Sequence, residues 1–175
     1  PLVRRIVANN PSPFTFRGTN TYVVGRGEVA VIDPGPQDGA HVAAILDALR
    51  GERIACIVVT HTHRDHSPAA RLLKQATGAP IVGCGVHVAA RPLAEGETAK
   101  LDAANDLDHI PDQELKDGEA TEGAGWRLVA LATPGHTMNH LAFHLPQENA
   151  LFSGDHVMAW STSIVDVASG QLLDV

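Results

Sequence analysis

The 175-residue sequence has few cysteines, no long apolar run and no signal-peptide pattern, and each absence excludes a class of protein. Its two cysteines, Cys56 and Cys84, lie in apolar or glycine-rich surroundings without metal-ligand spacing. We therefore expect buried, unpaired thiols in a reducing compartment. No apolar stretch reaches the ~18 residues that a membrane helix requires. Together these absences predict a cytoplasmic protein that does not contact a membrane.

Basic residues are also scarce and scattered. The chain has 13 Lys and Arg against 20 Asp and Glu, and its net charge of −7 argues against a large, charge-driven nucleic-acid or membrane surface. A composition of 44% hydrophobic and 19% charged residues is typical of a globular domain with a real core. The sequence starts at Pro1 without a methionine, so we expect a processed or partial chain.

Strand and helix signals divide the chain into a regular order with one poorly patterned segment. β-Branched or apolar runs predict strands at residues 21–24, 28–32, 54–60, 126–132 and 140–145, and in the short run that begins at residue 150. Helical spacing predicts helices over residues 42–49 and from Ser67, as the N-cap, to Gly78. Residues 84–125 are predicted only as loops and helix fragments.

The segment "HTHRDH", residues 61–66, directly follows a predicted buried strand. In α/β sheets, ligands bind beyond the carboxyl ends of strands. Two imidazoles two residues apart in an extended segment project to the same side, so His61 and His63 can hold one ion. Asp65 and His66 are then directed at a second position. Imidazole combined with carboxylate favours zinc, iron or manganese over calcium and magnesium.

Two later strand ends supply further donors of the same kind. His136 follows Pro134 and Gly135, and Asp155 follows Gly154. Glycine lets the backbone turn sharply and present the next side chain. Either pattern alone is typical of an ordinary turn, but together with residues 61–66 they predict a site for one or two metal ions.

The segments "THTHRDH", "TPGHT" and "LFSGDHV", in this order, resemble the metallo-β-lactamase superfamily. "PSPFTFRGTNTYVVG" and "GDHVMAWSTSIV" are similar to its lactamase-beta-two-like subgroup of metal-dependent hydrolases. The resemblance implies a single α/β (α+β) domain over residues 1–175, built as a four-layer αββα sandwich with metal ions at its open edge. It implies that His61, His63 and His136 are ligands of the first ion. Asp65 and His66 are the implied ligands of the second ion, and Asp155 is the implied carboxylate that bridges both.

Two departures from the family pattern modify this expectation. Ser67-Pro68 replaces the two glycines of many thioesterase-like members, which disfavours a glyoxalase II. The family also has a histidine well after the bridging aspartate, whereas only His156 follows Asp155 here. We therefore expect this sequence to lack the C-terminal strands, their helix and the last metal ligand of the domain.

The resemblance implies a metal-dependent hydrolase that uses a metal-bound hydroxide to cleave an ester, thioester, amide or phosphodiester. Asp65 is expected to orient the proton of that hydroxide. The expected cofactor is one or two Zn²⁺ ions, with iron or manganese as alternatives, and the expected partner is a small-molecule substrate. Two other functions stay open, a single-stranded RNA endonuclease and an iron-dependent redox relative of the same fold. The sequence leaves the oligomeric state open.

Several further polar residues have weaker patterns. His140 is predicted either to contact substrate or to hydrogen-bond a metal ligand. Asn20 is predicted to border the site. Arg64 is predicted to brace the metal loop or to meet an anionic substrate. The histidines that follow no pattern are predicted to lie at the surface; these are His41, His87, His109 and His144.

Overall fold

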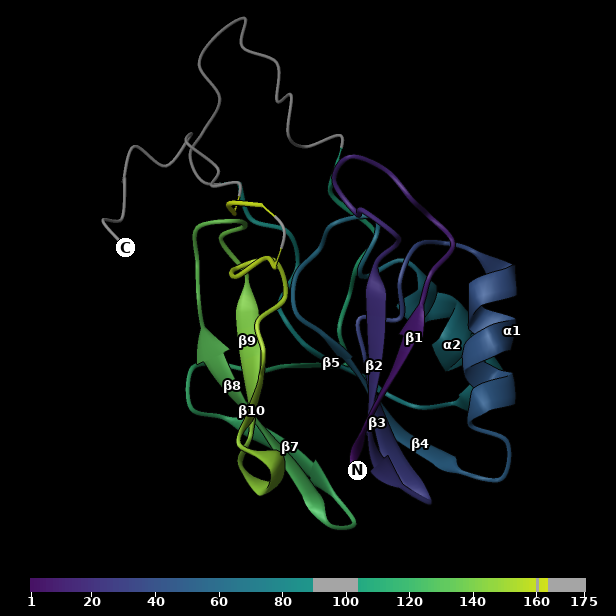
Figure 1. Cartoon of the computed structure of the whole chain (residues 1–175). Helices are drawn as coiled ribbons and strands as arrows, with labels where there is room; N and C mark the ends of the chain where they lie inside the picture. Colours follow the sequence, from purple (N-terminus) through teal and green to yellow (C-terminus); the bar gives the residue numbers. More distant parts are fainter. Residues whose placement is uncertain (90–103, 160, 164–175) are drawn as a thin grey trace, which may run out of the picture.

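The computed structural model describes residues 1–89, 104–159 and 161–163. Two β-sheets face each other, and helices α1 and α2 cover the outer side of the first sheet (Figure 1). The predicted α/β class is confirmed, and the described residues contain three of the four predicted layers. Part of the segment predicted as loops (residues 90–103) and part of "GDHVMAWSTSIV" lie outside the described residues.

The first sheet has six strands, antiparallel at one edge and parallel beyond it. Its order is β1-β2-β3-β4-β5-β6, and the pairs β3–β4, β4–β5 and β5–β6 are parallel. The strands are β1 Val3–Val7, β2 Asn20–Arg26, β3 Glu28–Ile32, β4 Arg53–Val59, β5 Ile81–Gly83 and β6 Gln113–Glu114. The strands predicted at residues 21–24, 28–32 and 54–60 are confirmed, and the first two pair as an antiparallel hairpin.

The second sheet is antiparallel, in the order β10-β9-β8-β7. Its strands are β7 Ala120–Gly123, β8 Trp126–Ala132, β9 Leu141–Leu145 and β10 Ala150–Phe152, with the 3₁₀ turn η2 Pro146–Glu148 before the last. The prediction of only loops and helix fragments before residue 125 was wrong for β6 and β7. These strands of two and four residues carry no apolar alternation, and pairing with β5 and β8 makes them strands.

Both predicted helices are present, but one cap differs from the prediction. Helix α1, Gly39–Ala48, begins where the Asp38 carboxylate accepts a hydrogen bond from Ala40 N. Helix α2, Ala69–Thr77, ends at Gly78 with a left-handed φ of 74°. The Ser67 hydroxyl does not cap α2. It donates instead to Asp106 Oδ2 at 2.8 Å, so the prediction of Ser67 as the N-cap was wrong.

The core lies on both faces of the first sheet, against the helices on one side and the second sheet on the other. Between the sheets, aromatic side chains connect the two layers. Trp126 on β8 is buried, and its indole N–H donates to Glu28 O of β3 at 2.9 Å. A Cβ atom at Gly25 or Gly123 would lie 2.5 Å from this indole, so both positions require glycine. Tyr22 on β2 also contacts Phe152 on β10, with ring centroids 5.2 Å apart. No helix in the described part of the chain combines the length and apolarity needed to cross a membrane.

Both cysteines are free and buried, as predicted. Burial raises the pKa of each thiol, which suppresses the reactive thiolate. We therefore expect Cys56 and Cys84 to resist iodoacetamide at pH 8 in the native protein and to react fully after unfolding. Mass spectrometry of alkylated peptides measures both states. A Cys56–Cys84 disulfide, or rapid native alkylation of either thiol, would contradict this prediction.

Candidate metal centre

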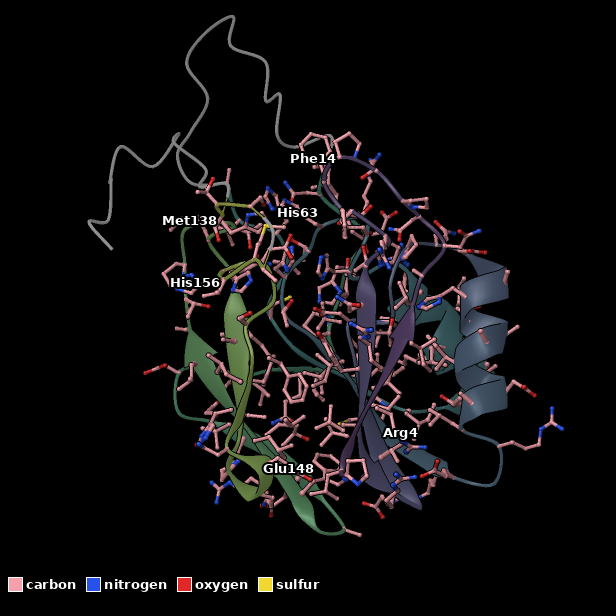
Figure 2. All side chains as sticks on the ribbon, in the orientation of Figure 1. Arg4, Phe14, His63, Met138, Glu148 and His156 are labelled. Atoms are coloured by element: carbon pink, nitrogen blue, oxygen red, sulfur yellow. The ribbon has the colours of Figure 1, made fainter. Side chains whose placement is uncertain are left out.

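Strand ends from both sheets meet at one edge of the molecule and carry the predicted site residues there. Residues 61–66 follow β4, His136 lies between β8 and β9, and Asp155 follows β10. Leu141 N at the start of β9 donates to Thr60 O at the end of β4 at 2.9 Å, which joins the two sheets at this edge. His63 accordingly lies at the end of the molecule opposite Arg4 and Glu148 (Figure 2).

Four side chains form a compact donor group. The distance from His63 Nδ1 is 3.1 Å to His61 Nε2 and 2.9 Å to His136 Nε2, and His136 Nε2 lies 3.4 Å from Asp155 Oδ2. One ligand atom from each of the four residues lies within 4.8 Å of all the others. A tetrahedral zinc ion with bonds of about 2.0–2.1 Å holds its ligand atoms ~3.3 Å apart. The donor types and spacing of this group therefore fit a metal ion.

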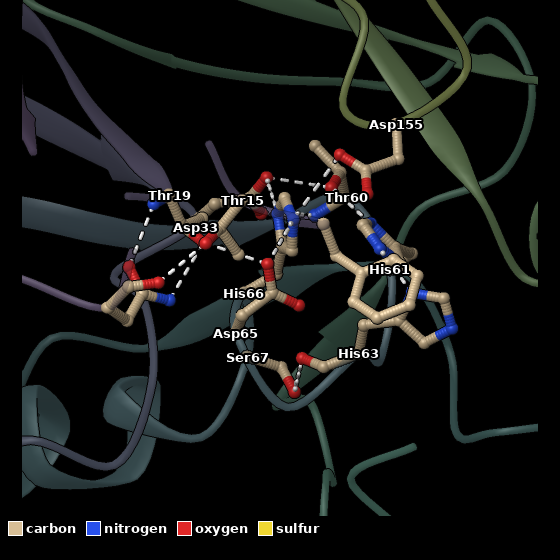
Figure 3. A network of polar contacts seen from close by, with 12 residues as sticks. Thr15, Thr19, Asp33, Thr60, His61, His63, Asp65, His66, Ser67 and Asp155 are labelled. Carbon is tan, nitrogen blue, oxygen red and sulfur yellow. Dashed lines mark hydrogen bonds and ion pairs between the residues drawn. The ribbon is translucent and has the colours of Figure 1, made fainter. Parts of the chain in front are cut away.

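A second donor group adjoins the first through Asp155. Its Oδ1 atom lies 3.3 Å from His66 Nε2, while its Oδ2 atom faces His136. Asp65 Oδ2 lies 3.3 Å from the same His66 nitrogen and accepts a hydrogen bond from Thr19 Oγ1 at 2.8 Å. The structure thus brings together all six predicted ligands, and Asp155 offers one oxygen to each group. Figure 3 shows His61, His63, Asp65, His66 and Asp155 at this site.

Burial keeps most of the imidazoles neutral. Desolvation, with neighbouring imidazoles, lowers the pKa of His61 well below its usual value and that of His63 to about 4. The pKa of His140 falls to about 3 for the same reasons. At neutral pH these rings therefore carry a free nitrogen lone pair, which is the form that binds a metal ion.

His66 and the carboxylates behave in the opposite way. Burial favours neutral His66, but Asp65, Asp155 and Asp33 outweigh it and raise the pKa of His66 well above its usual value. Burial also favours the neutral form of Asp65, which would raise its pKa, but His66 and Thr19 lower this pKa to about 2. The pKa of Asp155 is also held far below its usual range by His66 and His136, against its own burial. Both carboxylates are ionised at neutral pH.

Sequence reasoning missed one residue of this network, Asp33. Its buried carboxylate accepts hydrogen bonds from Thr60 N and Thr60 Oγ1, both at 2.8 Å, and from His66 Nδ1 at 3.0 Å. The sequence analysis assigned no role to this position, which directly follows the strand predicted at residues 28–32. The available signal was an aspartate directly after a buried strand, the same pattern that identified Asp155.

The residues with weaker patterns have mixed outcomes. Asn20, which was predicted to border the site, lines the cavity beside it. Arg64 Nε donates to Asn105 O at 3.2 Å, the bracing role that was one of its two predictions. His140 is buried, and its Nδ1 donates to Thr133 Oγ1 while its Nε2 accepts from Asp155 N at 3.2 Å. His140 thus hydrogen-bonds the backbone of a predicted ligand, which agrees with one of its two predicted roles.

The prediction that the unpatterned histidines lie at the surface was wrong for two of them. His41 is 4% exposed, with its Nε2 2.8 Å from Thr21 Oγ1, and His109 is 1% exposed and donates to Cys84 O at 3.2 Å. Their partners lie at least 20 residues away along the chain, so no local pattern marks them. His87 and His144 are half-buried.

A cavity of about 440 Å³ opens beside the second donor group. Its lining includes Asp65, His66 and Asp155 as well as apolar side chains, among them Tyr22 and Phe152. A substrate in this cavity would meet two ionised carboxylates and an imidazole next to the donor group that fits a metal ion. The arrangement is suited to activating water and polarising an oxygen of a bound substrate.

Fold and site together define a class of protein, a two-sheet α/β sandwich with a histidine and carboxylate centre at its strand ends. The chain belongs to the metallo-β-lactamase superfamily, whose family model matches residues 14–174. The resemblance identified from the sequence motifs is thereby confirmed. A metallo-β-lactamase family protein from Thermus thermophilus has a similar structure, with a TM-score of 0.70 and 27% identity over 94% of this chain and 62% of that one.

Two fungal proteins are related in sequence over nearly the whole chain. A lactamase-like protein from Pestalotiopsis microspora is 33% identical over 95% of this chain and 47% of its own length. An atrochrysone carboxyl ACP thioesterase from Paecilomyces divaricatus is 34% identical over 95% of this chain and 48% of its own length. The chain therefore spans about half the length of the curated relatives it matches.

We expect alanine at His61, His63 or His136 to lower any hydrolytic activity more than ~100-fold. Loss of a residue that only orients a metal ligand lowers activity about 10–100-fold, and loss of the ligand itself should lower it further. The residues lie beyond strand ends, so the fold should persist. Bound zinc, turnover and far-UV circular dichroism measure the three quantities. His144→Ala, on β9 and outside the donor groups, serves as the control. Near-normal turnover in any of the three variants would remove that histidine from the site.

The pKa shifts predict a stability maximum for the metal-free protein. Between about pH 4 and 6.5, the unfolded chain binds protons at His61, His63 and His140 that the folded chain does not, so stability rises with pH. Above about pH 7, the proton that folded His66 keeps and the unfolded chain loses outweighs the protons still bound by the other unfolded histidines, so stability falls. Thermal unfolding of chelator-treated protein should therefore show the highest Tm at about pH 7, where the two effects balance. A Tm that keeps rising to pH 8 would contradict the raised pKa of His66.

Proposed function

We propose that this protein is a zinc-dependent hydrolase and that a thioester is its substrate. The observation that carries the proposal is the donor group of three imidazole nitrogens and one carboxylate oxygen, spaced as the ligands of a tetrahedral zinc ion. His61, His63 and His136 with Asp155 would hold the first ion, and Asp65, His66 and Asp155 would contribute to a second. A bound ion supplies Lewis acidity and a water nucleophile at neutral pH.

The protein's own residues determine how a substrate is placed and where protons go. Asp65 is ionised and lines the cavity, so it can accept a hydrogen bond from a water molecule there and orient that molecule's proton. The Thr19 hydroxyl fixes the Asp65 carboxylate through a 2.8 Å hydrogen bond. His140 holds the backbone N–H of Asp155 and thereby the direction of its side chain. Asn20, at the cavity wall, is placed to orient a polar group of the substrate.

The names of two relatives and the lining of the cavity favour a thioester among the bonds that the sequence left open. Related proteins from Paecilomyces divaricatus and Aspergillus terreus are named atrochrysone carboxyl ACP thioesterases, at 34% and 31% identity. The apolar part of the cavity wall, which includes Tyr22 and Phe152, also suits an acyl group better than a phosphodiester backbone. We propose a small-molecule or carrier-bound thioester in a reducing, cytoplasmic setting, consistent with two free, buried thiols.

A substrate panel tests this proposal on the zinc-loaded, full-length protein. We expect an acyl-pantetheine thioester to be cleaved with the highest kcat/KM, ahead of a carboxylic ester, a lactone, bis-nitrophenyl phosphate and single-stranded RNA. A chelator should abolish turnover, and zinc should restore it, because the ion held by the donor group supplies the water nucleophile. Thiol release and fluorescence assays measure the rates.

His61→Ala protein, purified in the same way, controls for contaminating hydrolases. Cleavage of RNA without thioester cleavage would replace the proposal with the nuclease alternative. Oxygen consumption by iron-loaded protein, without any hydrolysis, would favour the redox alternative. No turnover of any of these substrates by protein that contains stoichiometric zinc would refute the thioesterase proposal.

A further inference from the structure

Residues 104–106 pair with the backbone of the loop that follows β4 and carries the predicted ligands. His63 is the centre of an isolated antiparallel bridge to this segment. On one side of the bridge, Asp106 N donates to Thr62 O at 2.6 Å, and on the other side Arg64 N donates to the first carbonyl of the segment at 2.8 Å. The backbone of this one ligand is therefore fixed by a segment that is distant in sequence.

The side chain of Asp106 attaches the same segment to helix α2. Asp106 is 5% exposed, and its Oδ2 atom accepts from Ser67 Oγ at 2.8 Å and from Arg71 Nη1 at 2.7 Å. A carboxylate that is removed from water is costly without such donors. Ser67 N also donates to His63 O at 3.1 Å. The loop, the start of α2 and residues 104–106 thus form a closed ring of contacts in which Asp106 takes part through both its backbone and its side chain.

His63 depends on this ring of contacts more than the other ligands of its loop do. His61 lies just after the buried strand β4, and the His66 ring is held by Asp33 through a 3.0 Å hydrogen bond. Among the described residues, the His63 ring nitrogens lie at hydrogen-bonding distance only from the imidazoles of His61 and His136. The position of the His63 ring is therefore set by its backbone.

We propose that Asp106 is a positioning residue for the first metal position. It holds residues 104–106 against the loop and thereby sets where His63 Nδ1 lies relative to the two other imidazoles. The inference rests on the proposed metal centre, but it concerns a residue that hydrogen-bonds none of the six predicted ligands. Loss of Asp106 should weaken the first position, whereas the second should change less because Asp33 holds His66 independently.

Arg71 provides the mildest test, because its side chain is 31% exposed and can be replaced without leaving a cavity. Arg71→Met removes the ion pair to Asp106 and keeps most of the apolar stem, whereas Arg71→Lys retains a positive charge there. Lys74→Met is a matched control. Lys74 also extends from α2 to an aspartate, Asp112, and neither residue of that pair hydrogen-bonds residues 61–66.

The experiment titrates the full-length, metal-free protein with zinc alone and follows the ring nitrogens of His63 and His66 by ¹⁵N NMR. Residues that orient metal ligands contribute about 10–100-fold to metal affinity. We expect Asp106→Ala to lower the affinity at His63 by a factor in this range and to change the affinity at His66 less. Arg71→Met should cause a smaller loss at His63. Arg71→Lys and Lys74→Met should bind zinc as the wild type does.

Hydrogen exchange in the metal-free protein provides a second readout that does not depend on zinc. The amides of Arg64 and Asp106 donate across the bridge, so the Arg64 amide should exchange faster in Asp106→Ala. The Ile57 amide, in the middle of β4, reports on the stability of the whole fold and should change less. A purely structural role of Asp106 would instead change both exchange rates by the same factor.

The outcomes separate this inference from the proposed function. Wild-type affinity at His63 in folded Asp106→Ala would overturn the inference, and so would equal losses at His63 and His66. If Asp106→Ala does not fold, Arg71→Met decides, and an affinity at His63 equal to that of Lys74→Met would overturn it. A wild-type protein that binds no zinc would refute the metal centre instead. The exchange of the Arg64 amide would then decide whether Asp106 holds the loop.

Discussion

The buried carboxylate of Asp33 is the constraint on which the site depends. A carboxylate removed from water is costly unless donors surround it, and here three of its hydrogen bonds come from Thr60 and His66. The parallel pairing of β3 with β4 makes this arrangement available, since Ile32 lies opposite Val58. The chain must then turn after β4 in the one way that brings His66 back to Asp33, and this turn also directs His61 into the site.

The second sheet completes the site through contacts of the same kind. The hydrogen bond from Leu141 N to Thr60 O fixes the position of the start of β9 relative to the end of β4. His140, one residue earlier, is thereby placed to accept from Asp155 N. A Cβ at Gly154 would lie 2.6 Å from His140 Nε2, so the glycine before Asp155 permits this approach. The donor groups therefore form only when both sheets are in register at this edge.

The parts of this structure that follow from local sequence were predicted, and the parts that depend on distant partners were not. The apolar runs of β3 and β4 reveal their burial, and "HTHRDH" reveals its chemistry by spacing alone. Strands β6 and β7 form because existing edge strands pair with them. Asp33 directly follows a buried strand, but this position alone does not distinguish a turn residue from a buried one, and His41 has no local pattern at all. Their roles appear only when parallel strands and helix α1 bring Thr60 and Thr21 beside them.

The charge balance of the site explains how the same residues serve a metal-free and a metal-loaded protein. Asp33, Asp65 and Asp155 all contact His66, and their combined charge raises its pKa well above the usual value. A proton on His66 thus offsets part of the carboxylate charge when no cation is present. Binding a divalent cation at His66 Nε2 requires that proton to leave, so metal affinity must rise with pH. Asp33 keeps its contact with His66 Nδ1 in both states. The His66 ring therefore need not reorient when a metal ion replaces the proton on Nε2.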